Sequence, residues 1–181
     1  LVYTQLDVDK AFDYYEKALA IYKKLHGEDH PKLAITNTNL GVLYRAEELY
    51  GDAVNYFEAA LKIWEKIFPQ PHPNKALVLM NLGQTYSSIG DTKASLGYYE
   101  RARVMYEEVQ GKKHPDVAYV YNLLGNEKLS MQKFDEALID YQKALIANIP
   151  DFNSEDILVN PGTRNYYNGN QLLYSLMYKA E

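Results

Sequence analysis

The feature that most constrains this chain is an internal repeat of 42 residues. A histidine followed by proline occurs at His30, His72 and His114, and leucine–glycine pairs at positions 40–41, 82–83 and 124–125 keep the same interval. Two further columns hold the register over four units: Ala18, Ala60, Ala102 and Ala144, and Tyr15, Phe57, Tyr99 and Tyr141. Several columns in one register indicate a repeat architecture, in which each unit buries its apolar face against its neighbours.

Each unit is predicted to contain two helices, which we term A and B. The A helices are expected over residues 31–46, 73–89 and 115–130, because proline suits a first helical turn. The B helices are expected over residues 10–25, 52–67, 92–109 and 134–148, and residues 1–5 are interpreted as the tail of a truncated A helix. Turn signals between A and B are Gly51, Gly90 with Asp91, and Met131 with Gln132, whereas Gly27, Pro69 and Gly111 are predicted to end the B helices.

Glycine recurs inside the A helices, at Gly41, Gly83 and Gly125. Each one costs about 1 kcal/mol relative to alanine in a helix interior. This cost is explained if another backbone approaches closely at those points. A second departure from the pattern is Lys128, which occupies the column of Tyr44 and Tyr86, and we expect it near solvent or against Glu155 or Asp156.

The combined pattern resembles the tetratricopeptide repeat. The motif residues of the middle unit are Leu82, Gly83, Tyr86, Gly90, Asp91, Ser95, Tyr99 and Ala102. The unit length and the Gly-x-x-His-Pro link are similar to those of the kinesin-light-chain subclass. The resemblance implies an all-α, right-handed α-solenoid of helix–turn–helix repeats over residues 1–148, with a partial first repeat and three full ones, followed by a C-terminal capping segment.

Residues 149–181 are interpreted as an aperiodic linker with a short amphipathic helix. The register is predicted to end after Ile149, and residues 171–180 place Leu172, Leu173, Leu176 and Met177 on one face. The stretch also resembles a segment of some bacterial multidomain proteins in which tetratricopeptide repeats precede a caspase-like CHAT domain. Because the sequence starts with Leu1 in mid-pattern, we expect a piece of a longer protein.

Composition excludes several function classes. The net charge of −5 without a long basic run argues against nucleic-acid binding. The sequence has no cysteine and no apolar run near the roughly 20 residues of a membrane span, so a soluble, cytoplasmic protein is expected. The three repeat histidines lie in separate units, too far apart to bind one metal. Asp151, Asn153 and Glu155 lack the glycine and final glutamate of a calcium loop. No catalytic motif is present, so neither an enzyme nor a cofactor is predicted.

The function predicted is protein–protein interaction, with a peptide or protein bound in the concave groove that the A helices of such arrays line. The residues assigned to this groove are Asn39, Val42, Arg45, Leu77, Met80, Asn81, Gln84, Ser88, Tyr119, Asn122 and Asn126. Only Arg45 is cationic, which argues against a clamp for a terminal carboxylate. The amides can instead both donate to and accept from a peptide backbone.

Two alternatives stay open. Asn39 and Asn81 could bond between neighbouring repeats rather than to a partner. The array could also be a structural or regulatory arm of a CHAT-protease-like protein. Neither the partner nor the oligomeric state is predicted.

Overall fold

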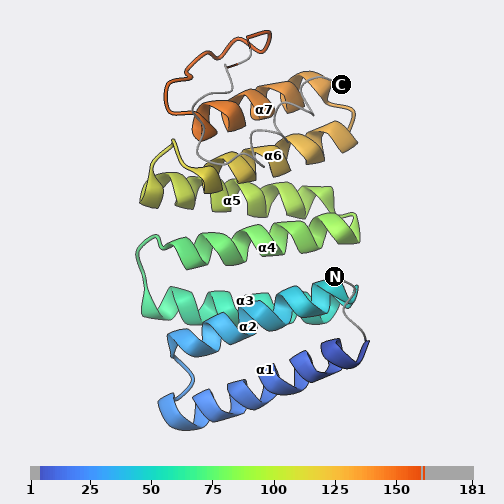
Figure 1. Ribbon diagram of the computed structural model, residues 1–181, viewed down its shortest axis with the longest axis vertical. Coiled ribbons are helices and arrows are strands. Elements are labelled where there is room, and N and C mark those ends of the chain that lie inside the picture. The colour runs from blue at the N-terminus through green and yellow to red at the C-terminus, as the bar shows by residue number, and fades with distance from the viewer. Residues whose placement is uncertain (1–4, 160, 162–181) are drawn as a thin grey trace. The chain divides into compact units, whose positions relative to one another are not determined.

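The computed structural model describes residues 5–159 and 161 of the chain, and these residues form seven helices and no strand. The chain divides into two compact units, residues 1–90 and 91–181. Unit 1 contains α1 (Gln5–His26), α2 (Pro31–Ala46), α3 (Tyr50–Ile67) and α4 (Pro73–Ile89). Unit 2 contains α5 (Thr92–Gln110), α6 (Pro115–Ser130) and α7 (Phe134–Asn148). Figure 1 shows that the helices of unit 1 lie side by side in chain order, with α1 outermost.

The A helices are α2, α4 and α6, and their predicted bounds are confirmed at both ends. The histidine before each proline caps the helix. The Nδ1 atoms of His30 and His72 each accept a hydrogen bond of 3.2 Å from the backbone N–H two residues later, and that of His114 accepts one of 3.1 Å. An acceptor at this position satisfies one of the unpaired N–H groups of the first helical turn. The three histidines therefore have a structural role, as the N-terminal caps of the A helices.

The B helices were predicted less accurately at their starts. The first one, α1, begins at Gln5 rather than at residue 10, and α3 begins at Tyr50, so Gly51 lies inside the helix instead of in the turn. The turn before α3 is made by Glu48, which has a φ of +61°. Gly90 and Gln132, one and two repeats later, also have positive φ values, of +88° and +61°. One left-handed residue per repeat thus joins each A helix to its B helix.

The closest helix packing in each compact unit is between an A helix and the B helix that follows it, α2 on α3 in unit 1 and α6 on α7 in unit 2. A Cβ atom placed on Gly41 would lie 2.7 Å from the ring of Phe57, and one on Gly125 would lie 2.5 Å from the ring of Tyr141. Both rings are fully buried. The expectation of a second backbone at these glycines is therefore wrong: an aromatic ring from the partner helix fills the space.

The segment after α7 contains a hydrogen-bonded turn at Asp156. The side chain of Asp156, 42 residues after His114, accepts a hydrogen bond of 2.9 Å from Leu158 N–H, and its carbonyl accepts one of 3.0 Å from Val159 N–H. These bonds match the cap and the first turn of an A helix. The predicted end of the register at Ile149 stays a prediction.

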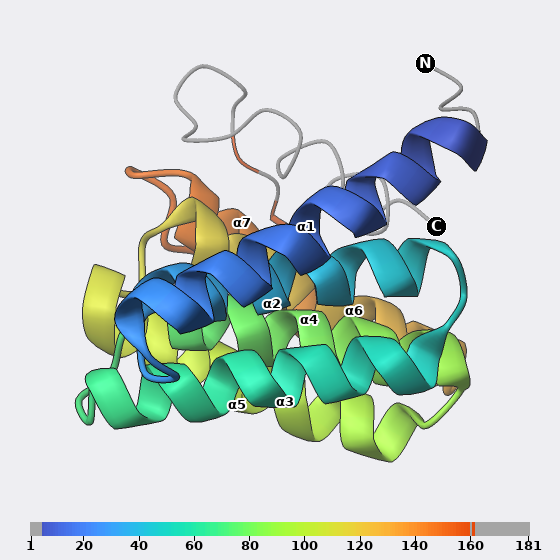
Figure 2. The same cartoon turned by 90° about the horizontal axis from the view of Figure 1, so that it is seen from below.

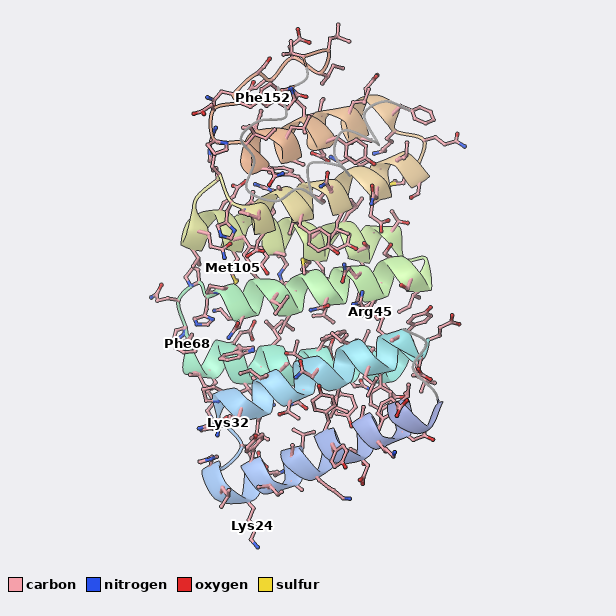
Figure 3. The ribbon with its side chains drawn as sticks, viewed as in Figure 1. Lys24, Lys32, Arg45, Phe68, Met105 and Phe152 are labelled. Carbon is pink, nitrogen blue, oxygen red and sulfur yellow. The ribbon has the colours of Figure 1, made fainter. Side chains whose placement is uncertain are left out.

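This segment packs on α7. Phe152 lies against Leu145 and Ile149, and Gln142 Nε2 donates to the carbonyls of Ser154, Asp156 and Val159 at 2.6, 2.9 and 3.2 Å. Figure 3 shows Phe152 on the segment beside α7. The predicted helix over 171–180, and most of the stretch that resembles CHAT-containing proteins, lie outside the described residues, so both stay predictions.

Candidate functional site

The candidate surface in unit 1 is built from the solvent-facing sides of α2 and α4, two A helices that contact each other. On α2 the exposed Ile35 and Val42 and the half-buried Asn39 follow helical spacing. One repeat later, Leu77, Asn81 and Gln84 occupy the same columns of α4. Solvent reaches 47% of Ile35, 40% of Val42 and 38% of Leu77. Three large apolar side chains are therefore exposed on adjacent helices, whose other faces are packed.

Arg45 braces the two helices at one end of this surface. Its guanidinium donates to Gln84 Oε1 at 2.8 Å and to Asn81 Oδ1 at 3.3 Å. Asn81 Nδ2 in turn donates to the backbone carbonyl of Leu77 at 3.0 Å. Figure 3 shows Arg45 pointing from α2 toward α4. Asn81 therefore bonds between neighbouring repeats, which was one of the two alternatives left open by the sequence. Its amide is buried.

Asn39 has a different environment from Asn81. Its side chain is half-buried, and the structure gives its amide no hydrogen bond within residues 5–159 and 161. A side-chain amide carries two donor hydrogens and an acceptor oxygen. Asn39 therefore lies between Ile35 and Val42 with donors and an acceptor that form no hydrogen bond to another described residue.

The other predicted residues differ in their exposure to solvent. Met80 of α4 and Asn122 of α6 are buried, and they share one column of the repeat, which faces away from solvent. Ser88 is exposed and donates from its hydroxyl to Gln84 O at 3.1 Å. In unit 2, Tyr119 and Asn126 are half-buried on α6, and Asn126 Oδ1 accepts a hydrogen bond of 2.8 Å from the Tyr141 hydroxyl.

A cleft of about 680 Å³ on unit 1 was not found by sequence reasoning. Leu33 of α2 forms part of its lining, with Leu19 of α1 and Tyr56 and Ile63 of α3. Burial raises the pKa of Tyr56 to about 12. Two ion pairs border the cleft, one between Lys23 and Glu28 and one between Lys66 and Asp29. Helix periodicity gives no signal for such a cleft, because its lining residues come from three helices.

No group of three or more potential metal ligands occurs among the residues that the structure describes. In the same part of the chain, no helix is long and apolar enough to cross a membrane.

Comparison with known proteins identifies the class. The sequence model of the tetratricopeptide repeat matches residues 2–66, 39–108 and 74–145, and together these matches cover most of the chain. The chain therefore belongs to the tetratricopeptide repeat family, whose fold is that of an all-α solenoid used for protein–protein interaction. No curated protein matches the sequence significantly.

Three solved structures show the same fold. The structure of BtubC (BKLC) from P. vanneervenii superposes with a TM-score of 0.78 at 23% identity, over 96% of this chain. This chain spans only 64% of the length of BtubC. A Podosopora anserina protein assigned as a kinesin light chain, with nearly identical TPR-like repeats, has a TM-score of 0.73 at 19% identity over 96% of this chain and 76% of its own. MamA has a TM-score of 0.53 at 21% identity, over 81% of this chain and 76% of its own. These structures share the helical-repeat fold of the chain, and one of them is described as having kinesin-light-chain TPR-like repeats.

Proposed function

We propose that the chain is a non-catalytic interaction module that binds an extended peptide on the exposed surface of α2 and α4. The observation that carries this proposal is the exposure of Ile35, Val42 and Leu77 around the amide of Asn39. Apolar surface removed from water contributes roughly 25 cal/mol per Å², so these side chains supply affinity. The Asn39 amide fixes the orientation of the bound peptide, because it can hydrogen-bond to one peptide group of the ligand.

The dimensions of the surface suit a short extended segment. Ile35 and Val42 are seven residues apart, which is about 10 Å along a helix at 1.5 Å per residue. An extended peptide advances about 3.3 Å per residue, so roughly four of its residues bridge the two side chains. The bonds from Arg45 to Asn81 and Gln84 hold α2 and α4 together before binding, which lowers the ordering cost of complex formation.

Unit 2 carries the same columns on α6, at Tyr119, Leu123 and Asn126. We propose that this stretch binds peptides in the same way. Asn122 and Met80 are assigned a supporting role instead, since both are buried.

The test is selection of peptides from a displayed random library against the chain. The affinity of a selected peptide is then measured by isothermal titration for the chain and for the triple variant Ile35→Ser, Val42→Ser, Leu77→Ser. Loss of three apolar contacts is expected to weaken binding by about 100-fold or more. Asn39→Ala is expected to weaken it about tenfold through the lost hydrogen bonds.

The matched control is the double variant Val104→Ser, Val109→Ser, which removes exposed valines from α5, a B helix. It should bind as the unaltered chain does. Equal binding by the unaltered chain and the triple variant, with helicity retained in circular dichroism, would place the peptide site elsewhere.

A further inference from the structure

The cleft of unit 1 lies between the B helices α1 and α3, over the A helix α2. Figure 2 shows that α1 and α3 run in the same direction at the outer end of unit 1. The cleft has a volume of about 680 Å³, and its lining comes from these three helices and from the loop that joins α1 to α2. Its size suits a small molecule, since ligand pockets commonly measure about 300–1,000 Å³.

The equivalent position in unit 2, two repeats later, is filled by side chains. The ring of Tyr121 from α6 has a cation from each flanking B helix near it: Arg103 of α5 lies 5.6 Å from the ring centroid, and Lys143 of α7 lies 5.7 Å from it. The Tyr121 hydroxyl donates to Glu107 Oε1 at 3.0 Å. A phenol ring therefore fits between two B helices at this point of the repeat.

The cleft is open in unit 1 because smaller residues stand in these columns. Three of its lining residues replace larger side chains of unit 2: Asn37 for Tyr121, Leu19 for Arg103, and Ala59 for Lys143. Arg103 contacts Tyr121 of the following A helix. The column of Leu19 is therefore on the side of a B helix that faces the next repeat, not the preceding one.

Asn37 gives the cleft a polar group on its α2 side. Its side chain is 8% exposed, yet its amide forms no hydrogen bond to another residue in the described part of the chain. Solvent nevertheless reaches both polar atoms of this amide, so they open into the cleft. A buried amide without a partner destabilises a protein, and a ligand that offers a donor and an acceptor supplies what this amide lacks.

The charges around the cleft balance one another. Its rim carries three acidic and three basic side chains: Glu16, Glu28, Asp29, Lys23, Lys62 and Lys66. Four of these six form two ion pairs with one another. The cleft therefore gives an ion of either sign little net attraction, whereas the apolar side chains of Leu19 and Ile63 favour an uncharged ligand.

We propose that this cleft binds a small, uncharged hydroxyaromatic molecule. The ring of the ligand occupies the space that the Tyr121 ring fills in unit 2. The hydroxyl of the ligand bonds to the Asn37 amide, because a hydroxyl both donates and accepts. The ligand is thus inverted relative to Tyr121, whose hydroxyl is directed from α6 toward Glu107 of α5. This site is separate from the proposed peptide surface on α2 and α4 and does not rest on it.

The test is an NMR titration of the isotope-labelled chain with para-cresol, which is the side chain of tyrosine as a free molecule. Saturable shifts are expected in the side-chain amide signals of Asn37 and in the backbone signals of Leu19 and Ile63. Toluene lacks the hydroxyl and should bind about fivefold more weakly, as expected for the loss of one hydrogen bond. In the Asn37→Ala variant the two molecules should bind equally.

Two variants fill the cleft with the side chains of unit 2. Asn37→Tyr places a ring on α2 and should abolish binding of para-cresol. Leu19→Arg with Ala59→Lys adds the two cations at positions that are not buried, and it should weaken binding about tenfold. The matched control is Asn55→Tyr, which places the same ring at an exposed position of α3 outside the cleft. The control should bind para-cresol as the unaltered chain does.

Equal affinity of the unaltered chain for para-cresol and toluene, or no saturable shift with either, would overturn the proposal. So would para-cresol binding that survives both filling variants with helicity retained in circular dichroism. If Asn37→Tyr does not fold, the variant at Leu19 and Ala59 decides alone. Shifts confined to Ile35, Val42 and Leu77 would also contradict the proposal, because para-cresol would then bind the surface of α2 and α4.

Discussion

Lys128 and Asp140 form an ion pair, with Nζ and Oδ2 2.6 Å apart, at the positions where Tyr44 and Tyr56 stack two repeats earlier. The ring centroids of Tyr44 and Tyr56 are 5.0 Å apart. The same pair of columns is thus aromatic in unit 1 and ionic in unit 2. The prediction that Lys128 meets an acidic group is confirmed, but its partner is Asp140 rather than Glu155 or Asp156.

Removing one member of this pair should destabilise unit 2 strongly. The Asp140 side chain is buried, so Lys128→Met leaves a carboxylate without its main partner, at an expected cost of about 3 kcal/mol. The double variant Lys128→Tyr, Asp140→Tyr should recover most of this loss by restoring the arrangement of unit 1. Urea unfolding followed by circular dichroism measures both. A double variant less stable than Lys128→Met would show that the two columns are not interchangeable.

Replacing Gly41 or Gly125 of the A helices even by alanine should destabilise the chain. Gly41→Ala and Gly125→Ala each force a methyl group against a buried ring, at an expected cost of about 1–3 kcal/mol. Gly97→Ala is the control, because it lies in α5 with open space around its Cα, and it should stabilise the chain by about 0.5–1 kcal/mol. Thermal unfolding distinguishes the two cases. If all three variants shifted the midpoint equally, ring contact would not explain why glycine recurs at this position of the repeat.

At the left-handed turn residues, substitution by glycine should stabilise the chain. Gln132 adopts a φ of +61° where Gly90 stands one repeat earlier. A left-handed conformation destabilises a non-glycine residue by roughly 1–2 kcal/mol. Glycine avoids this strain, but it loses more backbone entropy on folding, which offsets part of the gain. Gln132→Gly should therefore raise the unfolding free energy by a few tenths to about 1 kcal/mol, and Gly90→Ala should lower it. Urea titrations test this pair, and a destabilised Gln132→Gly would count against it.

The cap of α4 should make stability depend on pH. Burial first, and then the charge of Lys75, lower the pKa of His72, whose Nδ1 accepts the Asn74 N–H. Since the folded pKa lies below the unfolded value of about 6.5, the contribution of His72 is fully present above that pH and is lost as pH falls through the folded pKa. His72→Asn keeps a capping acceptor that does not titrate. Thermal midpoints between pH 5 and pH 7.5 should fall less for this variant on acidification, and an unchanged slope would refute the assignment.

The sequence predicted the A helices better than the B helices for a physical reason. Each A helix starts with a histidine cap and a proline, whereas Leu49, before α3, makes no side-chain cap, and the start of α3 was predicted two residues late. The columns also predicted that Val42 of α2 and Leu77 of α4 face solvent. Periodicity could not show that the Asn81 side chain accepts a hydrogen bond from Arg45.

The most direct test of the proposed function is amide hydrogen exchange on the complex of the chain with a peptide selected by display. Bound peptide should slow exchange in residues 31–46 and 73–89 and leave α1 unchanged. Protection confined to α1 and α3, around the cleft lined by Leu19 and Ile63, would contradict the assignment of the peptide site to α2 and α4.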